Sequence, residues 1–439
     1  MKTFATAFFA LFLSACMGAQ SQAPQSLQGA PAPYWSYKMC KGCHDRLVEQ
    51  HAESYHEKSF TNPAFQGQYF RELLPRVKSE PDLAKEAREC IACHSPITYM
   101  TSGTYPERPE QVVPELSGVT CDFCHTVTGY KDPTPGNGSY VSEPGERKFG
   151  PFRHEYNWHH VYGPLQTTSE FCGICHNATN RHGLQIKSTY SEWRESRFAR
   201  DGIECQSCHM NRKGYLVVGK AMYESGQAAH ITPGQAPYRR KLYTHRFLGA
   251  HSRTQITAGG AIALRIELEE SAGNEIIAHV VVDNKKTGHK MPSGSSDLRL
   301  LWLEVNVTMG DKTVSVPADS RGETDPYAVA GKDISDREML GGDIPEGSRI
   351  YRSVFVDGGG RPTLSSYDAV AVAFDNRLNA AEVRQETYRF AVPHDTTGRV
   401  AVTARLQYLP YPSSFTRRFG LTKEEPYEIA AVRKVIMLK

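Results

Sequence analysis

Apolar residues occupy every second position along much of the chain beyond residue 255, as at Leu264, Ile266 and Leu268. This is the period of a β-strand with one buried face. Eight or nine short strands with turns rich in glycine, aspartate and proline are predicted there, which favours an antiparallel β-sandwich over residues 255–439. The alternating runs include 264–268, 276–282, 301–307, 350–356, 388–392, 400–408 and 429–438.

Residues 34–252 lack this alternation and repeat a five-residue unit instead, Cys-x-x-Cys-His. The unit occurs five times and uses ten of the eleven cysteines. The five units are Cys40, Cys43 and His44; Cys90, Cys93 and His94; Cys121, Cys124 and His125; Cys172, Cys175 and His176; and Cys205, Cys208 and His209.

Three kinds of site use such a cysteine pair. A tetrahedral zinc site needs a second pair of ligands and does not require histidine directly after the second cysteine. A thioredoxin-like redox pair needs two thiols but no adjacent histidine. Covalent haem attachment needs all three residues, because the thiols form thioethers with the porphyrin vinyl groups and the histidine reaches the iron. Five complete copies therefore predict five covalently bound haem c groups, with short helices and loops wrapped around them.

The spacing of the units suggests an internal duplication. The first cysteines of successive units lie 50, 31, 51 and 33 residues apart. Thr104-Tyr105 follows the second unit and Thr189-Tyr190 follows the fourth, so units two and three correspond to units four and five. Chance similarity of short loops is the alternative interpretation.

The N-terminus predicts export. An apolar run too short to cross a bilayer ends in Leu-Ser-Ala-Cys at Cys16. This resembles a bacterial lipoprotein signal, in which residues 1–15 are removed and Cys16 is lipidated; an ordinary cleaved signal peptide is the alternative. Residues 16–33 predict a flexible tether, and Met17 and Gly18 favour the outer membrane, on its periplasmic or cell-surface face. The small formal charge of +3 argues against a nucleic-acid partner.

Each haem iron has two axial positions, and the motif histidine fills one of them. The helix that carries a motif lies along one face of its own haem, so a second histidine on that helix reaches a neighbouring haem more easily. The second ligands are therefore expected among the histidines outside the motifs, which are numerous enough for five irons. The candidates are His56, His159, His160, His245, His251 and His289.

Several stretches around these histidines share a pattern. They are Ser54-x-His56, SEFCGICHN (169–177), residues 189–210, His245-x-Phe247-x-Gly249, GHKMPSG (288–294) and RLLWLEV (299–305). With the cysteine motifs, they resemble the multihaem c-type cytochrome superfamily that includes the tetrahaem electron acceptors of hydroxylamine oxidoreductase. The resemblance implies that His56 and His245 are distal haem ligands. Phe198 stands where that pattern would place another ligand, so another histidine must replace it or one iron is open.

Two functions fit these features. An electron-transfer protein would relay single electrons between redox partner proteins through five closely spaced haems, with histidine on both sides of every iron. An oxidoreductase would act on a small nitrogen or sulfur oxyanion species at one open iron. No Cys-x-x-Cys-Lys unit marks such an iron, and the electron carrier is the favoured hypothesis. The sequence leaves open whether subunits form an oligomer or a filament.

Overall fold

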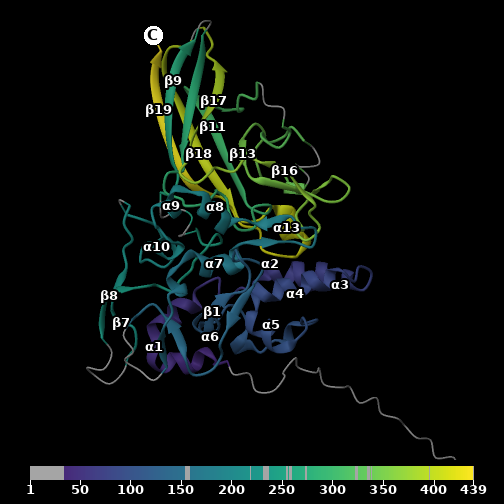
Figure 1. Ribbon diagram of the computed structural model, residues 1–439. Coiled ribbons are helices and arrows are strands. Elements are labelled where there is room, and N and C mark those ends of the chain that lie inside the picture. The colour runs from purple at the N-terminus through teal and green to yellow at the C-terminus, as the bar shows by residue number, and fades with distance from the viewer. Residues whose placement is uncertain are drawn as a thin grey trace, which may run out of the picture.

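The structure is a computed structural model of the 439-residue chain. It describes residues 34–153, 159–217, 219–230, 237–253, 256, 260–271, 274–321, 325–333, 337, 339–394 and 396–438. Cys16, the predicted signal peptide and the predicted tether lie outside these residues. Helices gather in one half of the molecule and long strands in the other (Figure 1).

The N-terminal half consists of short helices, loops and small two-stranded sheets. Its helices are α1 (Tyr37–Ala52), α2 (Pro63–Gln66), η1 (Gly67–Leu73), α3 (Leu74–Val77), α4 (Leu83–His94), α5 (Pro96–Ser102), η2 (Pro109–Gln111), η3 (Pro114–Leu116), α6 (Cys121–Thr126), η4 (Leu165–Thr167), α7 (Ser169–His176), α8 (Thr189–Glu195), α9 (Arg197–Arg200) and α10 (Cys205–His209). Its strands are β1 (Val127–Tyr130), β2 (Tyr140–Ser142), β3 (Lys148–Gly150), β4 (His160–Tyr162), β5 (Ala178–Thr179), β6 (Gln185–Lys187), β7 (Glu224–Gln227) and β8 (Tyr238–Leu242).

Every Cys-x-x-Cys-His unit lies in a helix, namely α1, α4, α6, α7 or α10. Polar residues before two of these helices stabilise their first turns, because Ser36 accepts a hydrogen bond from the Lys38 amide and Thr120 accepts one from the Phe123 amide. The described helices include none with the length and apolar character that a bilayer crossing requires.

The C-terminal half is built from antiparallel strands, as the alternating pattern predicts. One sheet has the order β17-β10-β9, a second has β12-β11-β18-β19 with β13 also paired to β11, and a third has β15-β14-β16. The elements are β9 (Ala263–Ser271), β10 (Glu275–Asp283), β11 (Leu300–Met309), β12 (Lys312–Val316), β13 (Arg349–Tyr351), β14 (Ser353–Val356), β15 (Pro362–Thr363), β16 (Ala371–Asp375), β17 (Val383–Ala391), β18 (Gly398–Leu409), α13 (Ser413–Arg418) and β19 (Tyr427–Leu438).

The first two sheets face each other across one apolar core. Val280 and Val282 of β10, Leu303 of β11 and Val402 of β18 belong to this core and are fully buried. Each such side chain contributes roughly 1.5–3 kcal/mol relative to its exposed state. The core explains why the period of two was a reliable signal here: the residues between the buried positions, such as Arg265, face solvent.

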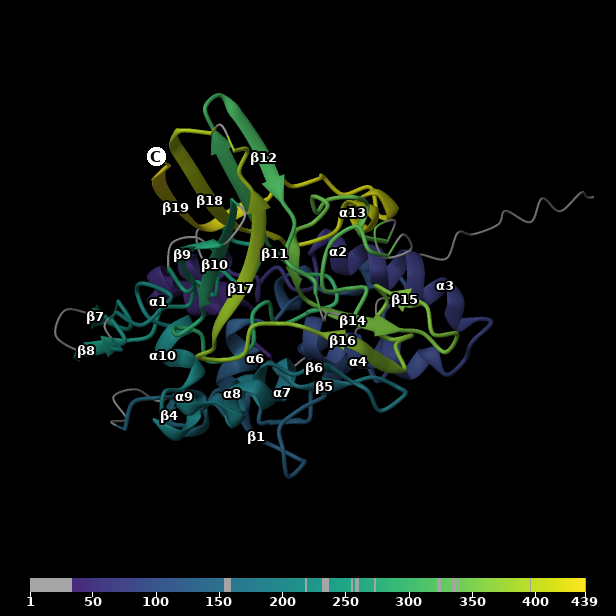
Figure 2. The same cartoon turned by 90° about the horizontal axis from the view of Figure 1, so that it is seen from above.

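The two halves pack closely against each other (Figure 2). Arg377 forms an ion pair of 2.7 Å with Glu192 of α8, and their side chains are only 6% and 7% exposed. Phe419, just after α13, packs with Ala64 of α2. The loop 288–294 from the β-half also reaches α8, where Ser293 Oγ lies 2.7 Å from Thr189 Oγ1. This contact brings a histidine-containing loop beside the motif helices.

Candidate functional site

A continuous internal space of about 1150 Å³, part of it open to solvent, runs through the helical half. The cysteines and histidines of all five units line it. Ordinary ligand pockets measure about 300–1000 Å³, so this space exceeds the size usual for one small ligand. The ten motif cysteines form no disulfide with one another. These residues therefore fit covalently attached macrocycles.

Four motif histidines each face a second histidine across this space. The ring centroids are 6.2 Å apart for His44 and His159, 6.1 Å for His56 and His176, 6.3 Å for His125 and His245, and 6.3 Å for His209 and His289. A metal ion between two imidazoles needs roughly 6.3 Å, from two metal–nitrogen bonds of about 2.0–2.1 Å and about 1.1 Å from each nitrogen to its ring centre. The spacing of these pairs is that of two axial ligands on one iron.

The orientation of these rings also suits ligation. The Nδ1 atoms of four of them each contact a backbone carbonyl oxygen, which assigns Nδ1 the proton and leaves Nε2 free to bind metal. The contacts are His44 to Ala228 (2.8 Å), His125 to Phe149 (2.7 Å), His245 to Tyr243 (3.1 Å) and His289 to Lys290 (2.9 Å). Burial, followed by neighbouring histidines, lowers the pKa of His56 and of His245 to about 3. Both are thus neutral, the form that coordinates a metal.

The facing histidines come from segments remote from the units they face. His56 follows α1, which carries the first unit, yet it faces His176 of the fourth unit. His245 follows the fifth unit but faces His125 of the third. This arrangement is the one expected if such histidines bind a neighbouring haem rather than their own.

The other two candidates from the sequence do not face a motif histidine. His160 lies with Nε2 2.8 Å from the Phe152 carbonyl oxygen. His251 has its Nε2 beside Arg299 (3.1 Å) and Tyr411 (3.2 Å). All six candidates line the internal space. Only His56, His159, His245 and His289 face a motif histidine there, while His160 and His251 contact other groups.

His94 differs from the other four motif histidines. Its Nδ1 lies 2.8 Å from the Ser59 carbonyl oxygen, as expected of a ligand. The described part of the chain places no second histidine opposite its ring. The ring of Phe65 instead stacks on the face of the imidazole, with centroids 4.0 Å apart and an interplanar angle of 8°. The sequence predicts a second histidine for each of five irons. Among the described residues, four of the five motif histidines face one.

Buried charged groups lie in the neighbourhood of His94 and Cys90. Lys187 of β6 is close enough to both to affect their ionisation, and its Nζ donates a hydrogen bond of 2.8 Å to Ser295. Burial lowers the pKa of Lys187, and Asp297 opposes this shift. Arg299 is also buried and lines the same space. Lys187 and Phe65 were not predicted from the sequence, because a lone lysine and a lone phenylalanine carry no motif.

Contacts between motif cysteines show which units are neighbours. Three pairs of motif cysteines lie close enough for their side chains to affect each other's ionisation: Cys40 and Cys121, Cys93 and Cys175, and Cys172 and Cys205. The first unit therefore lies against the third, and the fourth lies against both the second and the fifth. The His56–His176 pair connects the segment of the first unit to the fourth. All five units consequently form one connected group.

Comparisons with known proteins agree with this picture. Residues 39–126, which hold three of the five units, match the family described as cytochrome c554 and c-prime. A penta-heme cytochrome c552 from Thermochromatium tepidum has a similar solved structure, with a TM-score of 0.61 and 18% identity over 92% of this chain and 100% of that chain. At that identity the likeness shows the fold alone. No curated protein matches the sequence. The findings support a multihaem c-type cytochrome and do not extend to the relatives of hydroxylamine oxidoreductase.

Proposed function

We propose that this chain is an exported pentahaem electron-transfer protein. The four histidine pairs at 6.1–6.3 Å carry the proposal, because they would hold an iron on both sides and leave it no position for a substrate. When bound, haem c supplies a one-electron couple between two iron oxidation states. The protein's own residues space the five units into one connected group around a shared internal space.

The order of the relay follows from the cysteine contacts. Units one and three form one pair, units two, four and five form a row, and the His56–His176 pair joins the two sets. Electrons entering at any unit could thus reach every other unit through neighbours. Redox partner proteins would deliver and accept them, with the protein held at the outer membrane through a lipid on Cys16.

The site of His94 favours a second candidate function. An iron held by His94 would have no histidine from the described residues on its other side, and the half-buried Lys187 and the buried Arg299 lie in the same space. Buried positive charge attracts small anions. An oxidoreductase acting on a nitrogen or sulfur oxyanion at this position, supplied with electrons by the other four units, is therefore the alternative to a pure carrier.

Low-temperature EPR of the oxidised protein separates the two candidates, because high-spin and low-spin irons give distinct signals. Intact mass and haem staining first establish the number of attached haems, and fewer than five after full maturation would contradict the count. Four low-spin irons and one high-spin iron, with one equivalent of carbon monoxide bound after reduction, would support the oxidoreductase. Five low-spin irons without carbon monoxide binding would leave the pure carrier.

A further inference from the structure

Positive charge is concentrated in one segment of the chain. Residues 211–246 contain seven lysines or arginines and a single acidic residue, Glu224, which gives a formal charge of +6. The whole chain has a formal charge of +3, so the remainder is net −3. A solvated surface with mixed charges would not show this separation.

Glu224 does not neutralise this segment. Its carboxylate is shared by Arg46 at 3.7 Å and Arg246 at 3.8 Å. The other six cations have no carboxylate within ion-pair distance among the described residues. They are Arg212, Lys213, Lys220, Arg239, Arg240 and Lys241.

Aromatic rings hold two of these cations in place. The Arg239 guanidinium lies 4.2 Å from the ring centre of Phe152. Lys241 Nζ lies 4.4 Å from the ring centre of Tyr223 and 4.8 Å from that of Tyr243. Such contacts fix a cation at a surface without neutralising its charge. The positive charge is therefore positioned and still available to a ligand.

The cations surround a recess beside the fifth unit. Arg239, Arg240 and Lys241 line a hollow of about 600 Å³ together with Gln206 and Ser207 of α10. Glu204 is the one carboxylate in its lining, and it already accepts hydrogen bonds from Ser169 N (2.8 Å) and Oγ (2.6 Å). The recess is thus a basic hollow directly over a haem-attachment helix.

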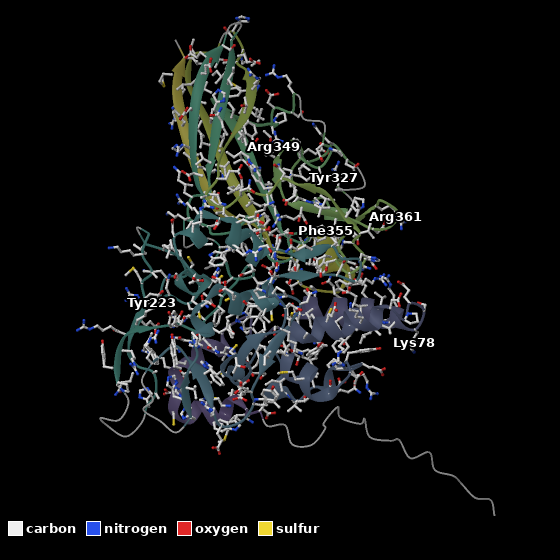
Figure 3. All side chains as sticks on the ribbon, viewed as in Figure 1. Lys78, Tyr223, Tyr327, Arg349, Phe355 and Arg361 are labelled. Carbon is white, nitrogen blue, oxygen red and sulfur yellow. The ribbon has the colours of Figure 1, made fainter. Side chains whose placement is uncertain are left out.

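The same segment also lies against the first unit. The His230 amide donates a hydrogen bond of 2.6 Å to the Cys43 carbonyl oxygen, and Cys43 is exposed. In two perpendicular views β7 and β8 lie at the edge of the molecule away from α3 (Figures 1 and 2). Tyr223, which precedes β7, is labelled at that edge in Figure 3. The basic surface therefore lies at an accessible edge next to two units.

We propose that this basic surface is the docking site of an acidic redox protein, which exchanges electrons with the fifth and first units. The inference rests on the proposed electron relay and adds the place and the charge of the partner. Complementary charge raises association rates by about 10- to 1000-fold at low salt. The net negative charge of the remaining chain would direct an acidic partner to this edge. A concave hollow beside a haem-attachment helix suits a protruding protein surface better than a flat lipid surface.

Electron transfer from a reduced plant-type ferredoxin, used as an acidic probe, tests the proposal. The Arg240→Glu/Lys241→Glu variant should react about 10-fold or more slowly than the parent at low salt, and the two should converge at about 0.5 M salt, where surface charges are screened. The rate of the Arg240→Gln/Lys241→Gln variant at low salt should lie between those of the parent and the glutamate variant. The control variant is Arg433→Glu/Lys434→Glu, at exposed positions of β19, which makes the same change in net charge. Its rate should stay within about twofold of the parent's rate.

Equal losses in the β19 variant and the Arg240/Lys241 variant would overturn the docking site, since net charge alone would then explain the rates. A parent rate that does not depend on salt would also overturn the docking site. So would a membrane result: the parent binds anionic vesicles, the Arg240/Lys241 change abolishes this binding, and the rates with ferredoxin stay unchanged. Dithionite, a small reductant, distinguishes this failure from failure of the relay. If dithionite does not reduce the haems, the relay itself is wrong.

Discussion

Replacing His56 with leucine should remove one axial nitrogen while leaving every haem attached. The change leaves Cys172 and Cys175 intact, so the fourth haem keeps its thioethers. His176 lies 6.1 Å from His56, and no other described imidazole faces it at such a distance. One iron should therefore change from low-spin to high-spin, its potential should rise, and it should bind carbon monoxide after reduction.

His51→Leu is the matched control, five residues away on the same segment. His51 is buried, but its Nε2 lies 2.9 Å from the Val119 carbonyl oxygen and its Nδ1 lies 3.2 Å from Glu57. Both nitrogens are thus engaged with protein groups. This variant should leave every spin state unchanged and lower the free energy of unfolding by about 1–3 kcal/mol through a buried acceptor left unpaired.

EPR integration against a haem standard gives the count of high-spin irons for each variant. The His56 variant should show one more than the parent, and the His51 variant should show the same number. An increase in the His51 variant and none in the His56 variant would reverse the assignment of the two histidines. An increase in neither would show that the pair at 6.1 Å does not hold an iron.

Three further predictions concern other parts of the chain. His289→Leu should convert one iron to high spin, with all five haems still attached, because His289 alone faces His209 among the described residues; EPR should show no change if the β-half has no part in ligation. Glu192→Ala should lower the free energy of unfolding by about 1–3 kcal/mol, because it removes one of the two carboxylates that pair with buried Arg377 while Asp375 stays in place at 2.9 Å; a denaturant titration that shows no loss would contradict the coupling of the halves. Cys16→Ala should move the protein from the membrane fraction to the soluble fraction on fractionation, and unchanged retention would argue against the lipid anchor.

The sequence predicted the broad features of this fold well, for physical reasons. Burial of one face of a strand imposes a period of two, so the strands β9, β10, β11 and β18 were visible as alternation. Strand β12 escaped notice because most of its side chains are exposed and no buried face imposes a pattern. Covalent attachment of haem requires two cysteines and a histidine close together in the sequence, so the five units were visible as motifs.

The sequence could not show which second histidine faces which motif histidine. His159 and His160 are neighbours in sequence, and only the fold shows which one faces His44. His289 depends on a loop from the other half, and its partner His209 is fixed by how the halves pack. Among the described residues, Phe65 and Lys187 rather than a second histidine lie near His94, and neither belongs to a local sequence pattern.

With an iron held between the two rings, each of the four facing pairs would also be a cross-link along the chain. They join residues 115, 120, 120 and 80 positions apart. In the chain-entropy treatment of disulfides, closing a loop of about 100 residues disfavours the unfolded state by about 4–5 kcal/mol, and overlapping loops contribute less than their sum. The last of these links would need His289, which follows strand β10 of the β-half. The helical half would then be fully closed only once that strand and the loop after it had been made, so the two halves would complete their folding as one unit.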